Sequence, residues 1–284
     1  MSTTTTPTTQ PVPAGLFRRA LRQKRFSFGF GVTVLVVLFA IFAPYLAPYG
    51  EKATAGPPYA KDGVFGTDYL GQDVLSRVMH GGQSVLAISV LATLLGMVLG
   101  ILIGVVAAYA GGWWDEVIMR LNDVLLAFPQ ILLALVVLTA LQNPSSWVIV
   151  LLVGVSHAPR VARVSRGVAL GIVSRDFVVA AEALGERRSR VILAEVLPNM
   201  TGPLLAEAGL RLTYSIGVVA ALGFLGFAAD PGAANWGQMM NENRLGLQTQ
   251  PWAVVAPVLI IAIFTIATNL MADGLAQVSQ RGDD

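Results

Sequence analysis

Cysteine is absent from the 284-residue chain, and histidine occurs only twice, as His80 and His157. Without cysteine the chain can form neither a disulfide framework nor a thiolate metal site. Neither histidine has a second histidine or a carboxylate at the spacing of a metal site, so no zinc centre is expected. We expect His157 to be a polar group at a helix interface and His80, beside two glycines, to be a loop residue.

Charged residues are also scarce, at 13% of the chain, whereas apolar residues make up 55% and the formal net charge is only +2. This composition excludes an ordinary soluble domain and gives no case for a nucleic-acid partner. No G-x-x-x-x-G-K-[ST] loop is present for ATP, and no nucleophile, base and orienting group converge in the sequence. The composition is typical of an integral membrane protein, and not of an enzyme.

Six apolar stretches have about the 20 residues needed to cross about 30 Å of hydrocarbon. They run over residues 26–46, 85–110, 117–141, 147–164, 204–227 and 252–271. In the fourth stretch Pro159 is expected to kink the helix or to mark where it leaves the membrane. The predicted fold class is therefore an all-α membrane protein with six transmembrane helices.

The amino-terminal part has three sections. Residues 1–14 carry almost no bulky apolar side chain and no charge, so we expect a disordered cytoplasmic tail. Residues 15–82 are expected to form an anchor helix and an outer loop, and residues 83–284 the core of five transmembrane helices. A cleaved signal peptide is disfavoured because the first apolar stretch is too long and is followed by Pro44, Tyr45 and Pro48 instead of small residues.

Lysine and arginine in short loops predict the orientation in the membrane. With the amino terminus inside, fourteen basic residues fall in inner segments and four (Lys52, Lys61, Arg77 and Arg244) in outer segments. Both termini are therefore expected in the cytoplasm. The loops 49–82 and 228–250 are expected to face outside, where Phe65 to Arg77 and Asp230 to Gln250, with Trp236, would form a docking surface.

A polar, arginine-bearing segment lies between the fourth and fifth apolar stretches, from Phe177 to Pro198. Gly185 is placed to cap a short helix by adopting positive φ. We expect this helix to lie outside the bilayer with an apolar stripe at i, i+3, i+4 and i+7. The stripe consists of Phe177, Ala180, Ala181 and Leu184.

Two interpretations of this short helix follow from its residues. Its stripe suits docking into a hydrophobic groove of another subunit, with Leu197 and Pro198 as a rigid joint to the fifth transmembrane helix. Alternatively, it lies on lipid headgroups, aided by the arginines that follow it, Arg187, Arg188 and Arg190.

Ionisable residues inside the fifth stretch indicate where a transport path could run, because charges in hydrocarbon usually face a cavity or a partner. Glu207 and Arg211 are four residues apart and can pair on one helix face, either lining the inner part of a path or joining helices. Other polar residues near helix ends are expected at the cytoplasmic rim, namely Asn122, Asp123, Asn269 and Asp273. In the second stretch Gly96, Gly100 and Gly104 form a small-residue ridge for close helix packing.

Six runs, in order along nearly the whole chain from about Phe17, resemble the permease subunits of bacterial binding-protein-dependent ABC importers. The similarity is to the second permease of dipeptide, oligopeptide and nickel uptake systems, which have the type I ABC importer permease fold. The runs are F-G-T-D-Y-L-G-Q-D-V-L-S-R at 65–77, G-G-W-W-D-E-V-I-M-R-L-N-D-V-L-L-A-F-P at 111–129, A-A-E-A-L-G at 180–185, L-P-N at 197–199, L-G-F-L-G-F at 222–227 and N-W-G at 235–237.

The resemblance implies that the segment near residues 176–193 is the cytoplasmic coupling helix with its support. The family pattern is Glu-Ala-Ala, three residues, Gly and a later Leu-Pro, but here Val179 occupies the glutamate position. Glu182, three residues on, could supply a displaced carboxylate to the ATPase, or it could be a solvated residue with docking left to apolar side chains. The matching positions are Ala180, Ala181, Gly185, Leu197 and Pro198.

The resemblance also implies an importer of short peptides in a bacterial cell membrane, with nickel or another small solute as the alternative cargo. The implied partners are a second permease, forming a heterodimer, two cytoplasmic ATPases that bind ATP and Mg²⁺, and an extracytoplasmic binding protein. This chain would bind no cofactor itself. A secondary carrier would show inverted repeats, which the sequence lacks, and a channel would need no ATPase.

Overall fold

The computed structural model describes residues 16–141, 145–228 and 232–280, and the regular structure in these ranges is helical apart from two isolated bridges. The predicted tail, residues 1–14, lies outside them. The helices are α1 (Leu16–Ala20), α2 (Lys24–Leu46), α3 (Val74–His80), α4 (Gly82–Ala110), α5 (Gly112–Ala127), α6 (Gln130–Ala140), α7 (Ser146–Val173), α8 (Asp176–Ala183), α9 (Arg188–Val191), α10 (Leu197–Asn199), α11 (Thr201–Phe224), α12 (Trp236–Asn243) and α13 (Trp252–Gln280).

Five helical segments are long and apolar enough to cross a membrane, namely α2, α3 with α4, α7, α11 and α13. A sixth crossing requires α5 and α6 together, and these two meet at an angle of 74°. The prediction of one helix over 117–141 is therefore wrong. Pro129 has no backbone N–H and favours an extended residue before it, and Phe128 has φ −86° and ψ 126°.

The fourth crossing is a single helix that continues past the expected end at residue 164 to Val173. Pro159 lies inside it without ending it. The carbonyl of Pro159 accepts a 2.9 Å hydrogen bond from the Asn122 side chain of α5. Asn122 is buried at this contact.

The predicted glycine ridge of α4 packs against α7. A Cβ atom on Gly100 would lie 2.4 Å from the Val161 Cβ atom, and one on Gly96 would lie 2.8 Å from the His157 Cβ atom. His157 is buried at this interface, as predicted. The two helices are close because the α4 backbone carries no side chain at these positions, so Val161 and His157 of α7 pack directly against it.

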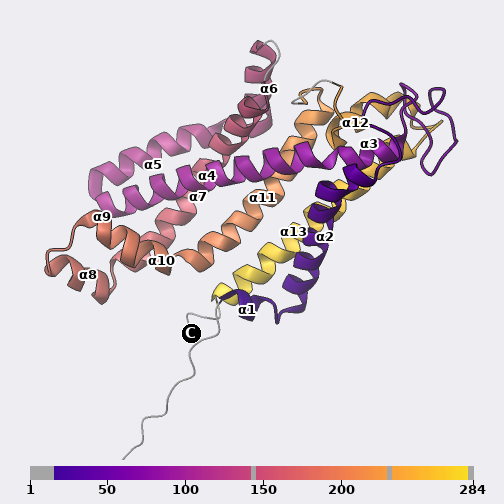
Figure 1. Ribbon diagram of the computed structural model, residues 1–284. Coiled ribbons are helices and arrows are strands. Elements are labelled where there is room, and N and C mark those ends of the chain that lie inside the picture. Colours follow the sequence, from indigo (N-terminus) through magenta and orange to yellow (C-terminus); the bar gives the residue numbers. More distant parts are fainter. Residues whose placement is uncertain (1–15, 142–144, 229–231, 281–284) are drawn as a thin grey trace, which may run out of the picture.

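A cap, comprising loop 47–73, α3, α12 and residues 244–250, lies at one end of the bundle, opposite α8 and α9 (Figure 1). Its centre is Arg77, whose Nη1 atom lies 2.5 Å from Asp68 and 2.9 Å from Glu242. Tyr69 donates its backbone N–H to the Asn243 side chain at 3.0 Å. Burial and the Glu242 carboxylate raise the pKa of Tyr69, so this phenol stays neutral.

Two expectations about the cap are wrong. Trp236 is not on its surface: the side chain is fully buried over Gly81 and Gly82, and its indole N–H donates to the Val78 carbonyl at 2.8 Å. His80 is not in a loop but ends α3, with Nδ1 2.7 Å from the Ser76 carbonyl. Both residues help to hold α3 in the cap.

Candidate functional site

Helix α8 presents an apolar face to solvent at the end of the bundle opposite the cap (Figure 1). Val178 is buried and Ala181 packs against the same apolar cluster as α7 and α11. The other three residues of the predicted stripe, Phe177, Ala180 and Leu184, are exposed, and Leu184 keeps 85% of its surface. The predicted stripe is thus divided: one residue anchors α8 to the bundle, and three remain free to contact a partner.

Gly185 ends α8 with φ +82°, as predicted from the sequence. The Glu186 N–H donates to the Ala181 carbonyl at 3.2 Å, and the Gly185 N–H donates to the Glu182 carbonyl at 3.0 Å. This pair of bonds is a Schellman motif, which requires a left-handed residue at the glycine. No atom lies within 4 Å of the position that a Cβ would take, so only the backbone conformation demands glycine here.

The Leu197 and Pro198 pair, expected to form a rigid joint to the fifth transmembrane helix, lies in a helical path that leads to α11. Leu197 has φ −59° and ψ −42°, and a helical path runs from α9 through a π-helical turn, Ile192–Val196, into α10. The N–H of Leu197 donates to the Ile192 carbonyl, five residues back. The wider π turn admits Pro198 at the start of α10, where a missing N–H costs little.

Glu182 is held by the bundle. Its carboxylate accepts a hydrogen bond from the Tyr109 hydroxyl in the last turn of α4. The guanidinium of Arg188 lies 6.0 Å from the centre of the same tyrosine ring. Sequence reasoning missed Tyr109, because nothing in its position at the end of an apolar stretch indicated a partner 73 residues away.

Glu207 and Arg211 form the ion pair expected in the fifth crossing, with 2.7 Å between Oε1 and Nε. Both side chains are buried inside the subunit. The guanidinium of Arg211 also lies 5.0 Å from the ring centre of Tyr214, which is exposed. Charge therefore lies within the bundle, beside an aromatic residue at its surface.

Two arginines of α7 pair with carboxylates of α5, a link that sequence reasoning missed. Arg163 lies 2.6 Å from Asp123, and Arg166 donates two hydrogen bonds of 2.5 Å to Asp115. Acidic residues in or near one apolar stretch and basic residues in or near another were the signal that could have indicated this pairing. A third arginine on the same helix, Arg160, has no carboxylate within ion-pair distance among the described residues.

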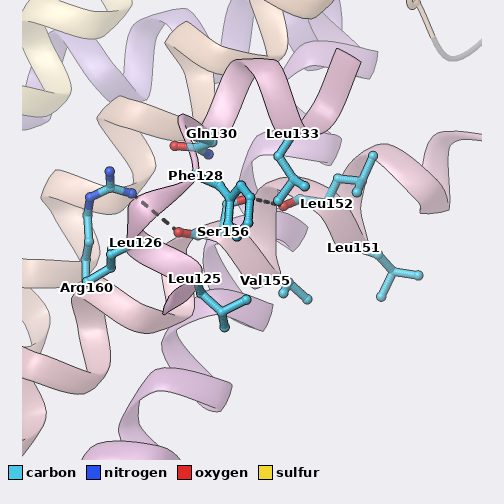
Figure 2. A pocket seen from close by; sticks show the side chains of 10 residues that line it. All are labelled: Leu125, Leu126, Phe128, Gln130, Leu133, Leu151, Leu152, Val155, Ser156 and Arg160. Atoms are coloured by element: carbon cyan, nitrogen blue, oxygen red, sulfur yellow. Dashed lines mark hydrogen bonds between the residues drawn. The ribbon is translucent and has the colours of Figure 1, made fainter. Parts of the chain in front are cut away.

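A cavity of about 160 Å³ lies where α5 bends into α6 (Figure 2). Arg160 lies at one end of it beside Leu126, whereas Leu151 and Leu152 lie at the other, and Gln130 lies between them near Phe128 (Figure 2). Its lining is Leu125, Leu126, Phe128, Gln130, Leu133, Leu151, Leu152, Val155, Ser156 and Arg160. In the described parts of the chain no group of three His, Asp or Glu side chains could hold a metal ion.

Two family models match the chain. Residues 96–282 match the binding-protein-dependent transport system inner membrane component, and residues 14–61 match the N-terminal TM domain of oligopeptide transport permease C. Together they cover both the permease core and the anchor helix.

Curated relatives align over most of both chains. The dipeptide transport system permease protein DppC of Alkalihalophilus pseudofirmus is 32% identical over 265 residues, covering 91% of this chain and 86% of the relative. The glutathione transport system permease protein GsiD of Escherichia coli is 36% identical over 264 residues, covering 91% and 87%. Among solved structures, an inward-facing MetNI methionine ABC transporter matches 70% of this chain and 96% of its own, with TM-score 0.55 and 18% identity.

Proposed function

The chain belongs to the family of binding-protein-dependent transport system inner membrane components, and from this we propose that it is one permease subunit of an ATP-driven importer of short peptides. It is a multi-pass inner-membrane protein with the type I importer permease fold. Peptides are the proposed cargo because similar proteins are named for dipeptide and glutathione transport. Those names favour peptides over nickel or another small solute.

The observation that carries the mechanism is the exposed apolar face of α8. A chain without a phosphate-binding loop must receive energy through a contact, and a short helix with exposed apolar side chains can dock into a groove of an ATPase. The docking residues are Phe177, Ala180 and Leu184, whereas Ala181 secures α8 to the bundle. Glu182 stays with Tyr109, so docking is apolar.

The proposed assembly contains this chain, a different permease as its twin, two cytoplasmic ATPases and an extracytoplasmic binding protein. ATP and Mg²⁺ are bound by the ATPases. Closure of the ATPases moves α8, and the π turn with Leu197 and Pro198 transmits that movement to α11. Two states of the path are then stabilised in turn, which is alternating access.

The α8 end of the bundle is placed in the cytoplasm, with both termini on that side. Basic residues are more numerous at this end: Arg175, Arg187, Arg188 and Arg190 flank or follow α8, and five more lie in α1, at the start of α2 and between them, whereas the cap carries four in all. On this orientation the Glu207 and Arg211 pair lies in the inner half of α11, where it borders the path.

The test is to purify the chain in mild detergent from its native membrane and identify co-purifying subunits by mass spectrometry. The wild type should bring a second permease and P-loop ATPases. Gly185→Val should lose the ATPases and ATP-driven uptake, because valine disfavours φ +82°. Gly185→Asn, which tolerates that conformation better, should keep part of both.

The matched control is Gly171→Val in α7, where an added side chain also meets nothing within 4 Å but φ is not positive. It should keep ATPases and uptake. Recovery of the chain alone, or uptake that persists without ATPases, would instead favour a carrier or channel with α8 lying on lipid.

A further inference from the structure

The three arginines of α7 face α5 in antiparallel order, and only two of them meet an acid. Arg166 pairs with Asp115 and Arg163 pairs with Asp123. Moving along α7 toward its start, Arg160 comes next, and beyond Asp123 the α5–α6 chain offers no carboxylate before α6 ends. A charge in a membrane-spanning helix is costly unless it has a partner or a function.

The bend between α5 and α6 leaves Arg160 exposed. It lies 14 residues from Ser146 and 13 from Val173, so it is about 20 Å from either end of α7. Its side chain makes one long hydrogen bond, 3.4 Å from Nη1 to the Ser156 carbonyl. Most of the donor capacity of the guanidinium is unused in the described structure.

Gln130 is the second unused donor at this place. Its Nε2 atom is buried and has no hydrogen-bond partner among the described residues. It lines the same cavity as Arg160, and the rest of the lining is apolar apart from Ser156 (Figure 2). A buried amide with a free donor can bind an acceptor that enters the cavity from outside the chain.

We propose that Arg160 and Gln130 bind the carboxylate of the peptide as it passes through the path, while the apolar lining contacts one of its side chains. The inference rests on the proposed function and names a substrate contact within it. A guanidinium can bind a carboxylate with two parallel hydrogen bonds, and the Gln130 amide supplies a further donor. A cavity of about 160 Å³ leaves room for a small apolar group beside that contact.

Uptake of one tripeptide as its free acid and as its C-terminal amide tests this. The whole complex is reconstituted in proteoliposomes with its binding protein, and the tripeptide is one whose two forms both bind that protein. Arg160→Gln should lower the initial rate for the free acid about tenfold relative to wild type, equivalent to about 1.4 kcal/mol, and change the rate for the amide less than about twofold. Arg160→Lys should recover part of the loss for the free acid.

Arg163→Gln is the matched control, since it removes an arginine that already has its carboxylate. It should affect both forms of the tripeptide equally. Equal losses of uptake for both forms in Arg160→Gln, or no loss, would overturn the inference. Loss of the second permease when Arg160→Gln is purified would also overturn it, because Arg160 would then be an intersubunit contact. If the intact wild-type complex imports neither form, the proposed cargo fails instead.

Discussion

Tyr109, in the last turn of α4, donates its hydroxyl to Glu182 of α8, so the end of a membrane-spanning helix holds the short helix that projects from the bundle. The bond joins residues 73 positions apart. Movement of α8 must therefore either carry the end of α4 with it or break this hydrogen bond.

Tyr109→Phe should weaken the coupling of transport to ATP hydrolysis. The substitution keeps the ring under Arg188 and removes only the hydroxyl. The hydrogen bond of that hydroxyl contributes about 1 kcal/mol net, or roughly a fivefold change in the population of α8 held against α4. We expect the ratio of peptide imported to ATP hydrolysed to fall severalfold in proteoliposomes. Tyr45→Phe, at an exposed position of α2, is the control, and an unchanged ratio in Tyr109→Phe would contradict the link.

Gly100→Ala should destabilise the bundle. Its Cβ would lie 2.4 Å from the Val161 Cβ atom and 2.7 Å from the Ala158 carbonyl oxygen, so α4 and α7 must separate. Overpacking of this kind costs about 1 to 3 kcal/mol. Thermal unfolding in detergent should begin at a lower temperature, whereas Gly217→Ala in α11, where a Cβ meets nothing within 4 Å, should leave it unchanged or raise it.

Arg77→Met should loosen the cap. It leaves Asp68, which is fully buried, and Glu242 without their shared cation, and removing one partner of a buried pair costs about 3 to 5 kcal/mol. We predict faster hydrogen exchange and proteolysis in loop 47–73. Arg244→Met, at an exposed position of the same cap, should change neither, and equal protection in both variants would refute a structural role for Arg77.

Arg211→Met should destabilise the protein more than the double substitution Glu207→Gln with Arg211→Met. The single change leaves a buried carboxylate 2.7 Å from where its partner was, whereas the double change removes both charges. Thermal unfolding of the three proteins measures the difference. Arg120→Met, which removes one side of an exposed pair with Glu116, should have little effect, and a single variant as stable as the double would show that the buried pair is not coupled.

The apolar stretches, the glycine ridge, the Gly185 cap and the Glu207 pair were all predictable, because each is set by local spacing along one helix. Contacts between distant segments were not. Trp236 reads as an exposed loop residue, but two glycines 154 and 155 positions earlier leave room for its indole. Likewise, the end expected at residue 164 was set by the apolar stretch alone, whereas packing against α4 keeps α7 helical to Val173.

The π turn at Ile192–Val196 contains one residue more than an α-helical turn would use. Each residue of an α-helix turns the chain by about 100° and advances it by about 1.5 Å. If that extra residue shifted to either end of the turn, the helical segment before the turn would rotate about its axis and advance relative to α11. This movement would require no hydrogen bond from the backbone nitrogen of Pro198. The chain between α8 and α11 can therefore rotate by one residue's step relative to α11, in addition to any bending.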